Sequence, residues 1–197
     1  TCALPICPDE QNLIVLDDIA LSFNRLSINS LNDGKQPLLF KGINEADNSI
    51  ACFNGEIFNY KELELAYLSK PYNRDEIGVL TDLYKLLGID FFNLLNGQFA
   101  IVVYDAKLKK LILGRDPFGI RPLFYSEYIN DSFVFASDVN SFWEFGIPRH
   151  ISLSQLGRIH ISWATHPAKT IWSNIKQVKP GSFIEIDLNS AGYFKSC

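Results

Sequence analysis

The stretch Phe53-Asn-Gly-Glu-Ile-Phe-Asn-Tyr60 carries the strongest structural signal in the chain. The apolar run from Ile50 to Phe53 leads into it and predicts a short β-strand. Asn54-Gly55 then favours a turn, because this dipeptide readily adopts the left-handed backbone of tight turns. The residues alone therefore predict a strand that breaks at Asn54-Gly55.

Helices and strands are expected on both sides of this stretch. Asn59 followed by Glu62 predicts a capping box, and with it a helix from Tyr60 to about Leu68. A second helix is expected to begin at Asp75 or Glu76 and to end at Gly88, with apolar residues at helical spacing between them. The patterns predict strands at 19–28, 98–104, 110–114, 123–125, 133–136 and 182–188, and helices at 137–145 and 152–158. Antiparallel strands interleaved with helices predict a layered α+β fold.

Composition excludes several classes of function. The chain has 197 residues, of which 47% are hydrophobic, and its formal net charge is −4. Without a basic stripe, nucleic acid is not expected as a partner. No apolar run approaches the ~18 residues that a membrane helix needs, so no membrane association is expected. The four cysteines lack metal-ligand spacing, which predicts reduced thiols, no metal site and a cytoplasmic location.

Further motifs follow in a fixed order along the chain. They are Arg25-Leu-Ser-Ile28 with Gln36-Pro37, Leu95-Asn-Gly-Gln-Phe-Ala100, the run from Gly114 to Tyr125, Phe135-Ala-Ser-Asp138 and Val178-Lys-Pro-Gly-Ser182. Together with the 53–60 stretch they resemble the class II glutamine amidotransferase domain of asparagine synthetases. The resemblance extends from about Pro8 to Leu188.

The resemblance implies an N-terminal-nucleophile hydrolase fold, an αββα sandwich of two antiparallel sheets between helical layers. It implies one domain over residues 1–197, with no cofactor of its own. In such domains an N-terminal cysteine thiolate attacks the side-chain amide of glutamine, and its own α-amino group serves as the base. The ammonia then passes to an ATP-dependent synthetase domain or chain, which is the expected partner.

The resemblance also assigns roles to three residues near the strand signal. Asn54 and Gly55 would form the oxyanion hole, because an amide N–H₂ and an accessible backbone N–H can both point at a developing O⁻. Arg25 would clamp the α-carboxylate of glutamine with its planar fork of donors. Without a catalytic role, these residues would be an Asn-Gly turn and a strand-surface arginine in a salt bridge.

Acidic residues complete the expected substrate site. Glu56 is the glutamate of the motif, and Glu76, with Asp75 beside it, stands where the family has an aspartate that holds the substrate's ammonium group. These acids could equally be charges at the entry to a helix, where the helix dipole favours them. Arg115-Asp116 and Asp138 are expected to buttress the fold or face a partner domain.

The pattern departs from the family before Arg25. Cys7 stands where a glycine is expected and Ile6 where an arginine is expected, and the preceding strand and helix are absent. Three explanations remain open: a longer chain, a degenerate domain without a nucleophile, or Cys2 as nucleophile after removal of Thr1. Cys2 would need that removal because the base must be the amine of the cysteine itself.

Two functions follow from these alternatives. The first is a non-catalytic or truncated amidotransferase-like domain that serves as a scaffold or docking domain of an asparagine-synthetase-like ligase. The second is an active glutaminase domain that hydrolyses glutamine and supplies ammonia to the ATP-dependent partner. No S-G-G-x-D-S-type ATP loop occurs in the sequence, so the amide-forming chemistry is expected in the C-terminal synthetase domain that is not present here.

Overall fold

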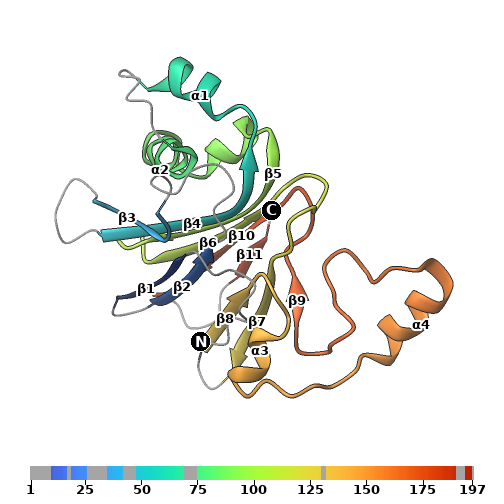
Figure 1. The fold of residues 1–197 in the computed structure, drawn as a ribbon. Helices are drawn as coiled ribbons and strands as arrows, with labels where there is room; N and C mark the ends of the chain where they lie inside the picture. The colour runs from blue at the N-terminus through green and yellow to red at the C-terminus, as the bar shows by residue number, and fades with distance from the viewer. Residues whose placement is uncertain are drawn as a thin grey trace.

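A six-stranded antiparallel sheet lies at the centre of the computed structural model, which describes residues 10–16, 19–25, 35–41, 48–68, 75–129, 132–189 and 194–196 (Figure 1). Its strands follow the order β11-β10-β6-β5-β4-β3. They are β3 (Leu38–Lys41), β4 (Asn48–Ile57), β5 (Gly97–Asp105), β6 (Lys110–Arg115), β10 (Phe183–Asp187) and β11 (Phe194–Ser196). The central strands β4, β5 and β6 carry three of the motifs side by side.

A second layer of strands covers one face of this sheet. It comprises the hairpin β1 (Glu10–Leu16) and β2 (Ile19–Arg25) and a three-stranded sheet of β7 (Phe124–Ile129), β8 (Ser132–Ala136) and β9 (Lys176–Gln177). Leu21 of the hairpin and Leu123 beside β7 share one buried core with Cys52 and Val102 of the central sheet. Both small sheets therefore pack on the same face.

Helices cover the other face. They are α1 (Tyr60–Tyr67), α2 (Glu76–Leu87) and the 3-10 helix η1 (Gly88–Leu94), which lie together above the central sheet in Figure 1. Leu80, Leu83 and Phe91 are buried there against Phe53 and Ile101. On the far side, α3 (Ser141–Glu144) packs against β8, while α4 (Leu153–Ser162) lies farther out. In the described part of the chain, no helix has the length and apolarity needed to cross a bilayer.

These layers confirm the predicted mixed α and β fold with antiparallel sheets. The strands predicted at 19–28, 98–104, 110–114, 123–125, 133–136 and 182–188 correspond to β2, β5, β6, β7, β8 and β10. The helix predicted at 137–145 is limited to Ser141–Glu144, whereas α4 extends to Ser162, beyond the predicted end at 158. The prediction of α2 is confirmed at both ends: Asp75 caps its first turn by accepting from the Gly78 N–H, and Gly88 follows its last.

The predicted break at Asn54-Gly55 is wrong. β4 continues through both residues to Ile57 and pairs with β5 over its last eight residues, so that Gly55 lies opposite Phe99. A tertiary pairing that begins more than forty residues later in the chain thus overrides the local turn preference of the dipeptide.

The predicted capping box at Asn59 and Glu62 is also wrong. The Asn59 side chain makes no cap bond to α1. It instead donates to the Leu94 carbonyl (2.9 Å) and accepts from the Asn96 N–H (3.0 Å). The polar end of the 53–60 stretch is therefore fastened to the start of the second motif, which leads into β5.

Candidate glutamine site at the edge of β4

The exposed edge of β4 follows from the pairing of its neighbour β5. Phe99 uses both of its backbone groups toward β6: its N–H donates to the Asp116 carboxylate (3.3 Å), and its carbonyl accepts from the Asp116 N–H (2.9 Å). Because backbone groups in antiparallel pairs alternate in direction, Gly55, directly opposite Phe99, points its N–H away from β5. Phe53 and Ile57 share this direction, being two residues away on either side.

The N–H groups on either side of Gly55 have acceptors. The Phe53 N–H donates to the Gln36 Oε1 (2.7 Å), and the Ile57 N–H donates to the Glu76 Oε2 (3.4 Å). For the Gly55 N–H, by contrast, no acceptor is recorded among the described residues. The edge therefore presents one backbone donor flanked by two satisfied ones.

Glycine is required at position 55 by its backbone and by its neighbour strand. Its φ of +138° lies in a region that side chains with a Cβ rarely adopt. A Cβ at this position would also collide with the carbonyl group of Gln98 on β5. The donor is thus held in place by a close approach of two backbones.

Asn54 occupies the strand position just before this donor. Side chains alternate along a strand, so Asn54 faces the same side of the sheet as Cys52, toward the second strand layer. It is half-buried, and no hydrogen bond to its amide group is recorded within the described ranges. An amide N–H₂ and a backbone N–H are therefore available at adjacent positions of one rigid strand.

Two of the predicted acids converge on the end of β4. Glu76 begins α2 and reaches the Ile57 N–H, while Glu56 is exposed on β4 itself. Burial raises the pKa of the Glu76 carboxyl, and the negative charges of Glu56 and Asp75 raise it further, against the lowering effect of the Ile57 hydrogen bond. Asp75 differs in role, because its carboxylate is used as the cap of α2.

Gln36 is a site-supporting residue that the sequence did not single out. Its side chain is buried, with 7% exposed, and its Oε1 satisfies the Phe53 N–H where β3 no longer pairs with β4. It lies in one of the motifs, at Gln36-Pro37. A buried glutamine next to a strand signal could have been recognised as a side chain that replaces a missing strand partner.

Asp116 supports the site from the opposite side of β5. Its fully buried carboxylate accepts from the N–H groups of Phe99, Phe118, Ile120 and Arg121. Burial alone would raise the pKa of this carboxyl, but the four donors together lower it below its usual value. Arg115 holds the same loop, donating to the carbonyls of Gly119, Arg121 and Val178. This agrees with the prediction that the pair buttresses the fold.

The structure describes some of the remaining predicted residues and not others. Arg25 ends β2, opposite Glu10 in the hairpin, but its side chain lies outside the described structure, as does all of Cys2. Asp138 is exposed and accepts from the backbone and side chain of Asn140, next to α3. Within the described residues, no cluster of three or more His, Cys, Asp or Glu side chains could hold a metal ion.

Comparison with known proteins identifies the family. Residues 6–194 match the family model of the glutamine amidotransferase domain. Asparagine synthetase [glutamine-hydrolyzing] 2 of Bacillus subtilis is 33% identical over 190 residues, which cover 93% of this chain and 25% of that protein. Amidase chyE of Penicillium rubens is 31% identical over 181 residues, covering 90% of this chain and 26% of that protein. The chain thus spans about a quarter of the length of these curated relatives.

A solved structure supports the fold. The glutamine phosphoribosylpyrophosphate amidotransferase of B. subtilis superimposes with a TM-score of 0.60 at 22% identity, covering 90% of this chain and 34% of that one. This confirms the expected N-terminal-nucleophile hydrolase arrangement of antiparallel sheets and helical layers. The chain therefore belongs to the glutamine amidotransferase domain family and is related to the asparagine synthetases.

Proposed function

We propose that this chain binds glutamine at the Asn54–Gly55 edge of β4 and acts as the amidotransferase domain of an asparagine-synthetase-type ligase. The observation that supports this most is the Gly55 N–H. It lies on the edge of β4 that faces away from β5, between two satisfied donors, has no recorded acceptor among the described residues, and is next to a half-buried asparagine. The Gly55 N–H and the Asn54 amide N–H₂ can donate hydrogen bonds to a carbonyl oxygen of a ligand.

The side-chain amide of glutamine fits these donors. Its carbonyl oxygen would accept from the Gly55 N–H and from the Asn54 Nδ2. The Gly55 donor is fixed by the strand, and both hydrogen bonds would gain strength as negative charge develops on that oxygen. The Glu76 and Glu56 carboxylates would attract the ammonium group of the substrate, and the Arg25 guanidinium would pair with its carboxylate.

The proposal has a hydrolytic and a non-catalytic version. Hydrolysis requires a cysteine thiolate, and burial raises the pKa of the Cys52 thiol to about 12, so Cys52 stays protonated at neutral pH. In the hydrolytic version Cys2 is the nucleophile after removal of Thr1, with its own α-amine as base. In the non-catalytic version the glutamine site is retained and the domain serves as a docking or scaffold unit.

The names and lengths of the relatives suggest the partner of this domain. Two relatives from B. subtilis are named glutamine-hydrolyzing asparagine synthetases, and the matched region covers only 25% and 30% of their length. We therefore propose that an ATP-dependent synthetase unit, a separate chain or further sequence, uses this domain. In this proposal the domain itself binds no cofactor. Its cytoplasmic location stays a prediction from the sequence.

Glutamine titration by calorimetry, paired with an assay of ammonia release, tests the proposal. We expect the chain to bind glutamine and Asn54→Ala to weaken binding at least tenfold. Ammonia release abolished by Cys2→Ala would favour the hydrolytic version, whereas binding without ammonia release would favour the non-catalytic one. A chain that binds no glutamine would contradict both.

A further inference from the structure

Residues 149–176 form an arm that reaches away from the central sheet and carries α4 at its far end (Figure 1). The two chain segments at its base are joined by backbone hydrogen bonds. The Ser173 N–H donates to the His150 carbonyl, and the Ser152 N–H donates to the Ile171 carbonyl, both at 2.8 Å. At the root, Trp172 packs edge-on against Trp143 of α3. The arm is therefore a built feature, held firmly at one end.

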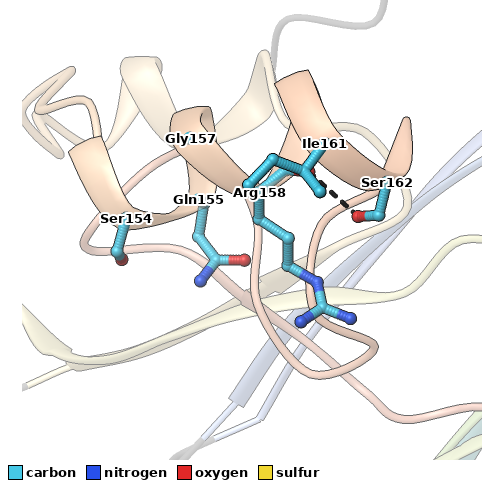
Figure 2. A pocket seen from close by; sticks show the side chains of 6 residues that line it. All are labelled: Ser154, Gln155, Gly157, Arg158, Ile161 and Ser162. Atoms are coloured by element: carbon cyan, nitrogen blue, oxygen red, sulfur yellow. Dashed lines mark hydrogen bonds between the residues drawn. The ribbon is translucent and has the colours of Figure 1, made fainter.

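The inner side of α4 is fastened within the arm. Gln155 is buried, with 6% exposed, and its Oε1 accepts from the His166 N–H (2.9 Å) on the returning segment. Figure 2 shows Gln155 and Arg158 pointing to the same side of the helix, and Gly157 and Ile161 also line the shallow hollow there. The orientation of α4 is thus fixed by Gln155 on its buried side.

The exposed side of α4 carries two large apolar side chains. Leu153 is 79% exposed and Ile161 is 86% exposed, and they are spaced eight residues apart, so they lie on one stripe of the helix. Gly157 lies midway between them, and a Cβ there would meet no atom within 4 Å. Trp163, just after the helix, is 93% exposed. Large apolar side chains clustered on a projecting element are typical of protein-binding surfaces.

The backbone conformation of Trp163 is unfavourable for a residue with a side chain. Trp163 follows the last residue of α4 with a φ of +59°, in the left-handed region that glycine adopts at helix ends. A tryptophan in this backbone conformation is sterically strained, and here its ring gains almost no burial in return. A residue that violates a local rule without a local gain is typical of a functional surface.

The charged side chains within the arm are all basic. Residues 145–184 contain no Asp or Glu, although the whole chain has 22 of them. The same segment contains Arg149, Arg158, Lys169, Lys176 and Lys179, together with all three histidines. A partner surface with carboxylates around an apolar groove would complement it, and a basic or neutral surface would not.

We propose that the outer face of the arm, formed by Leu153, Ile161 and Trp163, docks into an apolar groove rimmed by carboxylates on the ATP-dependent synthetase unit. This inference rests on the proposed function and specifies the surface through which the two units meet. Trp163 is the central anchor, because buried tryptophans contribute strongly to binding at interfaces.

The relatives favour this occupant over a second copy of the chain. Each relative carries about three quarters of its length beyond the matched region. We expect such a unit to contact the amidotransferase domain, and the arm presents it with a projecting apolar surface. Two copies of the arm would place like charges together, which opposes direct arm-to-arm pairing.

The test mixes this chain with the part of B. subtilis asparagine synthetase 2 outside the matched region, made as a separate polypeptide that shows a cooperative melting transition. Docking should shift the Trp163 fluorescence to shorter wavelength and shield it from acrylamide, because the ring passes from water into a groove. Trp163→Gly and Leu153→Ser should each weaken binding at least tenfold. Leu65→Ser, a change at an exposed leucine of α1, should leave it unchanged.

Trp163→Gly separates lost docking from lost folding. It should raise the melting temperature of the isolated chain by about 2–4 °C while it weakens docking. Equal affinity of wild-type and both arm variants, no binding by the wild-type chain, or self-association through the arm would each overturn the inference. Glutamine binding, measured on the same samples, reports on the proposed function separately: it should be the same with and without Trp163.

Discussion

The Asn54–Gly55 edge of β4 and the outer face of the arm both leave groups without partners, but they do so in opposite surroundings. At the edge, one N–H lies between neighbours bound to Gln36 and Glu76, on a strand clamped against β5. On the arm, large apolar side chains stand in water at the end of a projecting helix. The first arrangement suits a small polar ligand, and the second suits a protein surface.

The comparison shows that rigidity and availability are separate properties. Gly55 is available because its neighbours hold the strand so tightly that no side chain fits there. Trp163 is available because nothing in the described chain covers it. Substitutions should therefore have opposite effects on folding in the two regions.

The largest expected effect is that of Gly55→Ala. The added Cβ would enter the Gln98 carbonyl and force a strained φ, so we expect a loss of about 4 kcal/mol in the free energy of unfolding. Gly157→Ala is the matched control in the arm, where a Cβ meets open space inside a helix. It should stabilise the chain by about 0.5–1 kcal/mol. Urea unfolding measures both, and similar values for the two variants would contradict the comparison.

Asp116→Asn should have the next largest effect. An amide cannot replace a carboxylate that accepts four N–H groups, so about 2 kcal/mol of stability should be lost at pH 7. Because the folded-state pKa of Asp116 is lowered, its stabilisation is present above the unfolded-state pKa and is lost as pH falls through the folded one.

The difference between wild type and Asp116→Asn should therefore shrink in acid. Unfolding curves at neutral and strongly acidic pH measure it. A difference that stays constant with pH would show that the carboxylate charge is not what holds the loop.

Glu76→Gln should have a smaller effect, seen in binding. If the Glu76 carboxylate attracts the ammonium group of glutamine, the variant should bind about tenfold more weakly at neutral pH, or about 1.4 kcal/mol. An ordinary glutamate has a pKa of about 4.3. Because the pKa of Glu76 is raised above its usual value, the affinity of the wild type for glutamine should start to fall at a higher pH as the solution is acidified. Calorimetry across pH would measure this, and an identical pH profile in the variant would remove Glu76 from the site.

The sequence predicted what depends on local pattern. The helix α2 carries its own signals, from the Asp75 cap to Gly88, and both were confirmed. The strands β5 and β6 are continuous apolar runs, and these too were confirmed. The family motifs placed Asn54, Gly55 and Glu56 on one segment, which the structure extends as a strand.

The sequence did not predict what depends on distant partners. The Asn59 side chain bonds residues 94 and 96, not its own helix, and Gly55 is fixed by a strand that starts at Gly97. Gln36 acts on Phe53 across seventeen positions. Such contacts leave no periodic trace in the sequence, because each one joins single residues of separate elements. The sequence patterns also did not predict β1, β3, β9 and β11, all of which lie at the edge of a sheet.

The Gly55 amide proton itself gives the most direct test of the central claim. In an amide-resolved NMR titration with glutamine, we expect the Gly55 resonance to move downfield as its N–H gains an acceptor. The Phe53 and Ile57 resonances should move less, because their N–H groups already donate to Gln36 and Glu76. A Gly55 resonance that stays in place at saturating glutamine would contradict the proposal that this edge binds the amide of glutamine.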